Sequence, residues 1–233
     1  MEKIIIAIGG GEIKSKTTLK IDEYIAKLAK KHAGDKRATG LFFGTASHDS
    51  MPYFNSFRKT YTSVFDIKAD VALTVYGEMN KEHIQAKIDA ADMIYAGGGD
   101  TVFMLDKWRE TGLLSSILAA YEAGKIICGL SAGAICWFRD MYTDYEIMRG
   151  ESAEYVLKKG LGVLDGTMCP HFNEREKDFI EVMLKNDIKT AYGVENDAAL
   201  VFKDGALSES LSAGGKAYTL ELLPTGEVKK TEI

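Results

Sequence analysis

Short apolar runs alternate with amphipathic segments along the first half of the chain. Runs of strand length occur at KIIIAIGG (3–10), ATGLFFGTAS (38–47), DVALTVYG (70–77), DMIYAGGGD (92–100) and KIICGLS (125–131). The intervening segments TTLKIDEYIAKLAKKHA (17–33), MPYFNSFRKTYTSVF (51–65), NKEHIQAKIDAA (80–91) and TVFMLDKWRETGLLSSILAAYEAG (101–124) carry apolar residues at helical spacing. The pattern predicts strands at the runs, helices between them, and a further helix that begins at Ala132.

Strands that are apolar on both faces and separated by helices are typical of parallel sheets covered on both sides. We therefore expect an α/β fold with a mostly parallel, doubly wound sheet. The tail DGALSESLSAGGKAYTLEL (204–222) predicts hairpins, which would add antiparallel strands at the C-terminal edge. No repeat, low-complexity tract or linker interrupts the chain, so residues 1–233 are interpreted as one domain.

Composition and charge argue against several classes of partner. The chain has 233 residues, of which 46% are hydrophobic and 27% charged, and a net charge of -5, which argues against nucleic acid as the main partner. The apolar run at the N-terminus is too short for a signal or a membrane span, so we expect a cytoplasmic protein with no membrane partner. Its three cysteines lack zinc-ligand spacing, and we expect buried thiols and no metal.

The stretch ICGLSAGAICW (127–137) contains a G-x-S-x-G pattern between a predicted strand and a predicted helix. That context is typical of a nucleophile elbow, in which a sharp turn places the serine at the end of a sheet. Gly129 and Gly133 would leave room for the adjacent strand and helix. Ser131 is the predicted nucleophile; the simpler alternative is a helix N-cap.

A serine nucleophile needs a base, and His171 in GTMCPHFNERE is the strongest candidate, because Pro170 fixes its approach and Phe172 gives it an apolar wall. His48 is an alternative, in a loop after a predicted strand. The N–H of Ala132 and that of Gly98 or Gly99 would stabilise an oxyanion. A glycine loop can also cradle a nucleotide phosphate, but no nucleotide-binding motif is present and no cofactor is expected.

Taken together, GLSAGAICW, YAGGGDTVFML, PHFNERE and GVENDAALVF resemble the peptidase E family, the serine peptidases of family S51 that include aspartyl dipeptidases and cyanophycinases. The resemblance implies a fold related to class I glutamine amidotransferases, with Ser131 at the position of their elbow cysteine. It also implies that Ser131 is the nucleophile, that His171 is the base, and that Gly99 and Ala132 form the oxyanion hole.

The sequence offers several candidates for the third member of the catalytic triad, the residue that orients His171. In GVENDAAL, Asn196 aligns with the family's acidic residue, and Glu195 precedes it. Neighbouring strand residues point to opposite faces, so only one of the two can face His171. Asp144 and Glu146 are the next candidates.

The expected substrate is a short peptide. Arg175, with Arg139 as the alternative, is the candidate for binding a substrate carboxylate. The competing hypothesis is a non-catalytic binding or regulatory protein of the same fold. Pattern alone leaves the chain as a monomer or a homodimer.

Overall fold

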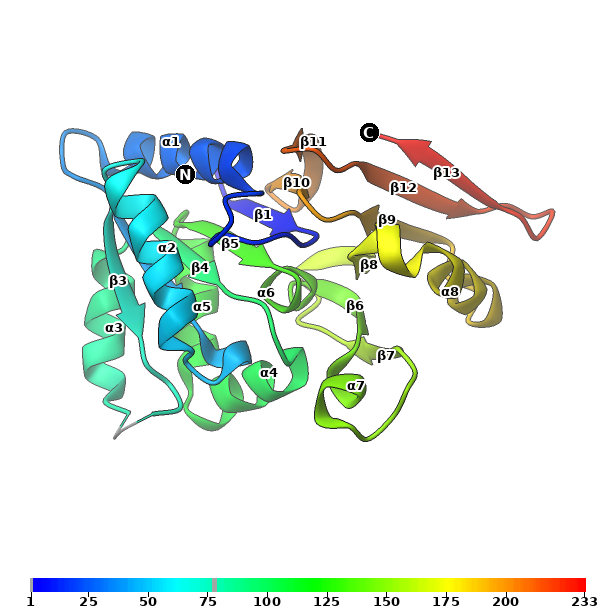
Figure 1. Ribbon diagram of the computed structural model, residues 1–233, viewed down its shortest axis with the longest axis horizontal. Coiled ribbons are helices and arrows are strands. Elements are labelled where there is room, and N and C mark those ends of the chain that lie inside the picture. Colours follow the sequence, from blue (N-terminus) through cyan, green and yellow to red (C-terminus); the bar gives the residue numbers. More distant parts are fainter. Residues whose placement is uncertain (1, 77–78) are drawn as a thin grey trace.

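The computed structural model describes residues 2–76 and 79–233, and within them the strands form two sheets (Figure 1). The seven-stranded sheet has, in spatial order, β11 (Ala206–Ser212), β10 (Ala198–Lys203), β1 (Ile4–Ile8), β5 (Ile126–Leu130), β4 (Met93–Ala96), β2 (Thr39–Phe43) and β3 (Lys68–Ala72). The six-stranded sheet has β13 (Val228–Glu232), β12 (Ala217–Leu222), β9 (Thr190–Val194), β8 (Leu164–Pro170), β6 (Phe138–Thr143) and β7 (Val156–Lys159).

The first sheet confirms the mostly parallel α/β architecture. Strands β1, β5, β4, β2 and β3 are parallel, and β10 joins β1 antiparallel, followed by β11. The α-helices of the described residues are α1 (Leu19–Ala33), α2 (Met51–Ser63), α3 (Lys81–Ala90), α4 (Thr101–Glu110), α5 (Leu113–Glu122), α6 (Ala132–Ile135), α7 (Tyr145–Arg149) and α8 (Phe172–Lys185).

Helices cover both faces of this sheet, as predicted. Side chains alternate along β1: Ile6 packs in a cluster with α1 and α2, whereas Ile5 and Ala7 pack in a cluster with α3, α4, α5 and α6. Burial of both faces explains why β1 reads as a continuous apolar run.

The second sheet corrects the expectation of a single sheet. Strand β8 lies between β6 and β9 and is parallel to both, and antiparallel strands complete the two edges. Helix α8 covers one face of this second sheet through Phe172 and Phe179. Phe138 on β6 and Met168 on β8 pack into the core cluster of the first sheet. The antiparallel tail is therefore divided: β10 and β11 extend one sheet, and β12 and β13 extend the other (Figure 1).

Two element boundaries differ from the sequence pattern. The strand expected over 70–77 is β3, which spans Lys68–Ala72 instead. It ends there because the Asp49 carboxylate accepts the N–H groups of Thr74, Val75 and Tyr76, which turns the chain away from the sheet. The last residue of the expected strand, Gly77, lies outside the described residues.

The apolar pattern over 101–124 is two helices. They are separated at Gly112, which has a left-handed φ of 70° that glycine adopts without strain.

Candidate active site

Ser131 lies at the turn between β5 and α6, with a strained backbone (φ 50°, ψ −107°). A Cβ at Gly129 would overlap the carbonyl of Gly133, and a Cβ at Gly133 would overlap the carbonyl of Ala96. The two glycines therefore allow strand, turn and helix to pack at backbone contact. Ser131 makes no N-cap hydrogen bond through its side chain, so the alternative of a helix cap has no support in this contact.

His171 lies at a second strand-to-helix turn, between β8 and α8, in the left-handed conformation (φ 50°, ψ 41°). Its Nε2 is 2.9 Å from the Ser131 Oγ, which places the two side chains in hydrogen-bond contact. The backbone supports this approach: Ser131 N–H donates to Ile8 O, and His171 N–H donates to Gly9 O, so the end of β1 holds both turns.

The other nitrogen of His171, Nδ1, is 2.6 Å from the Oδ1 of Asn196, which follows β9. Glu195 turns the opposite way, and its carboxylate accepts from Lys216 N–H and Tyr218 O–H. Of the two neighbours left open by the sequence, the structure thus brings Asn196 to the histidine.

The two remaining candidates for a third member are engaged with other side chains. Asp144 accepts from the Arg175 Nη2 at 2.7 Å, and Glu146 accepts from the hydroxyl of Tyr145. The His48 ring packs against Phe103 near the start of α4, with ring centroids 4.2 Å apart and ring planes tilted by 42°.

Gly10 also lies beside the His171–Asn196 pair, although the sequence pattern assigned it no role. A Cβ there would overlap the Asn196 Oδ1 and come against the His171 Nδ1, so the absence of a side chain makes room for the His171–Asn196 pair. The signal in the sequence was the triple glycine that follows the first apolar run.

The loop after β4 runs beside Ser131. A Cβ at Gly98 would lie 3.6 Å from the Ser131 Cβ, and the Gly98 N–H donates to the Tyr53 hydroxyl at 3.3 Å. Gly99 has φ 136° and packs against the carbonyl of Ala46. Within residues 2–76 and 79–233, the N–H groups of Gly99 and Ala132 have no hydrogen-bond acceptor.

Arg175 is buried, with 5% of its side chain exposed. It pairs with Asp144, and its guanidinium lies 4.5 Å from the ring centroid of Tyr155. These contacts give Arg175 partners within the protein, and the hypothesis that it binds substrate stays a prediction. Arg139, the alternative, pairs with Asp140 and Asp165.

Burial lowers the pKa of His171 from its ordinary value, and the positive charge of Arg175 lowers it further. The hydrogen bond to Asn196 and the charges of Glu174 and Asp144 act in the opposite direction. The net effect is a lowered pKa, which favours the neutral imidazole, the state that can accept a proton.

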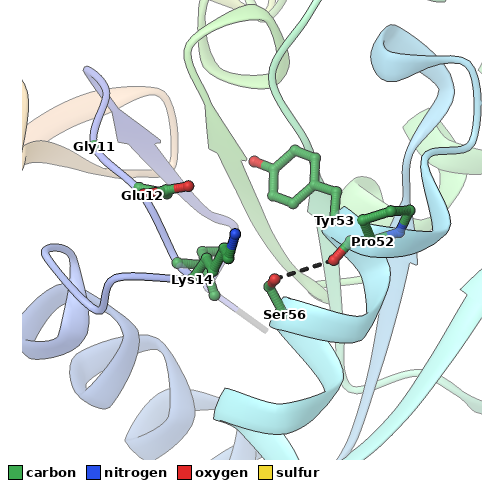
Figure 2. Close-up of a pocket in the computed structure, with 7 residues that line it drawn as sticks. Gly11, Glu12, Lys14, Pro52, Tyr53 and Ser56 are labelled. Atoms are coloured by element: carbon green, nitrogen blue, oxygen red, sulfur yellow. Dashed lines mark hydrogen bonds between the residues drawn. The ribbon is translucent and has the colours of Figure 1, made fainter.

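A pocket of about 340 Å³ opens between the loop that follows β1 and the start of α2. The polar ends of Glu12 and Lys14 turn toward this space from the loop, and Tyr53 and Ser56 face them from α2 (Figure 2). Tyr53, which lines the pocket, accepts from the Gly98 N–H, and Gly98 lies beside Ser131.

The three cysteines are buried, as predicted, and burial raises the pKa of each thiol. Across the described parts of the chain, no group of three or more His, Cys, Asp or Glu side chains could hold a metal ion. The helices described in these ranges include none that is both long and apolar enough to cross a membrane.

Comparisons with known proteins agree with one another. A profile of peptidase family S51 matches residues 5–210. An uncharacterized peptidase, YgaJ, from Bacillus subtilis is 29% identical over 223 residues, with 94% of this chain and 91% of the relative covered. A protein named peptidase E from Streptomyces coelicolor is 25% identical over 211 residues, with 78% and 85% covered.

Solved structures show the same fold. The crystal structure of a peptidase from an acI-B1 Actinobacterium has a TM-score of 0.74 and 18% identity, with 100% of this chain and 94% of that chain covered. A peptidase E protein described as putative, from Listeria monocytogenes EGD-e, has a TM-score of 0.64 and 19% identity, with 91% and 99% covered.

Proposed function

The chain belongs to peptidase family S51, and from this premise we propose that it is a serine peptidase that hydrolyses short peptides, dipeptides among them, at Ser131. The observation that carries the proposal is the hydrogen-bonded series Ser131–His171–Asn196, with 2.9 Å between the Ser131 Oγ and the His171 Nε2. The finer fold assignment, to the class I glutamine amidotransferase-like folds with a serine at the elbow, is part of the same proposal.

In this mechanism His171 Nε2 accepts the Ser131 hydroxyl proton as Oγ attacks the peptide carbonyl carbon. The carbonyl oxygen becomes an oxyanion, to which the N–H groups of Gly99 and Ala132 donate. The scissile C–N bond then breaks as His171 returns the proton to the leaving amine. Water, activated by the same histidine, hydrolyses the acyl-enzyme and restores Ser131.

Asn196 takes the place of the usual acidic member of the triad. Its Oδ1 accepts from the His171 Nδ1–H and fixes the ring, as the asparagine of papain-like enzymes does. A neutral amide stabilises imidazolium less than a carboxylate does. We therefore expect catalysis that depends more on orientation than on charge at this position.

The experiment that tests the function uses a fluorophosphonate probe, which reacts with activated serines. The wild-type protein should be labelled and should cleave members of a dipeptide library, whereas Ser131→Ala should do neither. Ser208→Ala, an exposed serine on β11, is the matched control and should behave as wild type. Absence of labelling and of hydrolysis in the folded wild-type protein would instead favour the non-catalytic binding protein.

We further propose that the pocket beside Tyr53 accepts a substrate side chain. Ser56→Phe would fill this space and should raise KM about tenfold with a smaller change in kcat, since a lost binding contact of about 1.4 kcal/mol is worth a factor of ten. Asn55→Phe, on the neighbouring exposed position of α2, is the control. An unchanged KM for Ser56→Phe across the library would place substrate elsewhere.

A further inference from the structure

The hydrogen-bonded series does not stop at Asn196. The Nδ2 of Asn196 donates to the Oε1 of Glu174 at 2.6 Å, while its Oδ1 faces the His171 Nδ1 at the same distance. Glu174 lies in the first turn of α8, three residues after His171, and its own N–H donates to the His171 carbonyl. One helical turn therefore carries the proposed base and a carboxylate, with the Asn196 amide between them.

We infer that Glu174 is a positioning residue that fixes the direction of every hydrogen bond between itself and Ser131. The inference rests on the proposed function, because it concerns how the same site prepares its base. An ionised carboxylate can only accept hydrogen bonds, so Asn196 must present its Nδ2–H₂ to Glu174. The Asn196 Oδ1 then faces His171, whose Nδ1 must carry the proton, and the Nε2 lone pair is left to accept from Ser131.

If the hydrogen bonds between Asn196, His171 and Ser131 ran in the opposite direction, His171 could not act as a base. An asparagine amide has a donor and an acceptor of nearly equal shape, so Asn196 by itself could turn its Nδ2 toward His171. The imidazole would then accept at Nδ1 and carry its proton on Nε2, pointing at Ser131, and no lone pair would remain for the hydroxyl proton. A carboxylate third member prevents this directly; here Glu174 prevents it through Asn196.

Other contacts hold the asparagine in place but do not choose its direction. The Oδ1 of Asn173 accepts the backbone N–H of Asn196 at 2.9 Å, which fixes the main chain and leaves the side-chain amide free to turn. The charged groups that act on His171 are Arg175 on α8, Asp144 at the start of α7, and Glu174 itself. Of these, only Glu174 is hydrogen-bonded to Asn196.

The first test is Glu174→Ala, an exposed helical position where alanine is well tolerated. We expect kcat to fall about tenfold with little change in KM, because a hydrogen bond to a charged group is worth about one such factor. The acidic limb of kcat/KM should move to lower pH, since removing a nearby negative charge lowers the pKa of His171. Glu181→Ala, also exposed and on α8, is the matched control and should change neither quantity.

A second test separates positioning from a merely structural role. In an Asn196→Asp background, the introduced aspartate accepts from the His171 Nδ1 without help, and the Glu174 charge opposes it. Glu174→Ala should then leave kcat unchanged or raise it. A structural role would lower kcat in both backgrounds, and that result would overturn the inference.

The outcomes for the inference and for the proposed function are distinguishable. If Ser131→Ala abolishes hydrolysis but Glu174→Ala has wild-type kcat and an unmoved acidic limb, the inference alone fails. If Ser131→Ala retains hydrolysis, the serine mechanism fails, and Glu174 loses its assigned role with it.

Discussion

The two strand-to-helix turns of the site resemble each other in backbone but differ in what surrounds them. Both Ser131 and His171 have a φ of 50°, and both donate their N–H to the end of β1. The turn at Ser131 leads into the four-residue helix α6, buried along its length. The turn at His171 leads into α8, a long amphipathic helix with an exposed face.

At Ser131 the neighbours are backbone atoms, whereas at His171 they are side chains. Gly129 and Gly133 are required because main-chain carbonyls fill the space around the first turn. Around the second turn lie the side chains of Asn196 and Glu174, and the His171–Asn196 pair packs against Gly10. The nucleophile is thus placed by steric exclusion, and the base by a hydrogen-bond network assembled from distant segments.

The largest expected effect comes from removing either functional side chain. Ser131→Ala and His171→Ala should each lower kcat by several powers of ten, and the double variant should be scarcely worse, because the two groups act as a unit. Peptide hydrolysis and circular dichroism measure activity and folding separately. More than about a tenth of the wild-type rate in Ser131→Ala would contradict the assignment of the nucleophile.

The next prediction contrasts a glycine from each turn. Gly129→Ala should destabilise the protein by about 3 kcal/mol or more, because the new Cβ overlaps a main-chain carbonyl that cannot move alone. Gly10→Ala should leave stability closer to wild type but lower kcat by about 10²-fold, since the new Cβ displaces the side chains of His171 and Asn196.

Urea denaturation and peptide hydrolysis measure the two glycine variants. The comparison fails if Gly10→Ala unfolds as readily as Gly129→Ala. It also fails if Gly10→Ala keeps full activity.

A smaller effect is expected at the neighbouring pair that follows β9. Asn196→Ala should lower kcat by about 10²-fold, because His171 loses its orienting partner. Glu195→Gln should keep kcat within about a factor of two, since Glu195 contacts Lys216 and Tyr218 instead, and should cost about 1 kcal/mol of stability. Steady-state kinetics on one dipeptide measures kcat for both variants. A larger loss of kcat in Glu195→Gln than in Asn196→Ala would show that Glu195, and not Asn196, orients His171.

The smallest effect is a shift in pH dependence. Activity requires neutral His171, so kcat/KM should fall as pH drops through the pKa of this group. Because burial and Arg175 lower that pKa, the acidic limb should lie below 6.5, the ordinary value for histidine. Asn196→Asp should move the limb upward, because a carboxylate beside the imidazole favours its charged form. If the acidic limb of kcat/KM in the wild-type protein lay above pH 6.5, the pKa of His171 would not be lowered, and this prediction would be wrong.

The first sheet was predictable because β1 and β5 are buried on both faces and read as continuous apolar runs. The second sheet was not predicted. Its strand β9 (TAYGV) is short and partly exposed, and β7 (VLKK) ends on two lysines. Such segments become strands through pairing with distant partners, and that information is absent from local periodicity.

The same distinction applies to the site. Ser131 could be predicted as the nucleophile because its sharp turn requires small residues next to it, and Gly129 and Gly133 show that requirement in the sequence. The choice between Glu195 and Asn196 was not, because alternation along a strand shows that only one faces the site without showing which. Glu174 carried a usable signal: it follows His171 by three residues, so in a helix that begins there the two lie on the same side.

The position of β1 between β5 and β10 bears on how the chain is built during synthesis. Ile4 pairs with Lys203, and Ile5 pairs with Ile127, so β1 is synthesised before both of its neighbours and pairs with β10 long after it pairs with β5. Pairing between such distant segments is intrinsically slow. The turns at Ser131 and His171 both donate to the end of this strand, so a nascent chain can bring the two side chains together only after residue 171 has been synthesised.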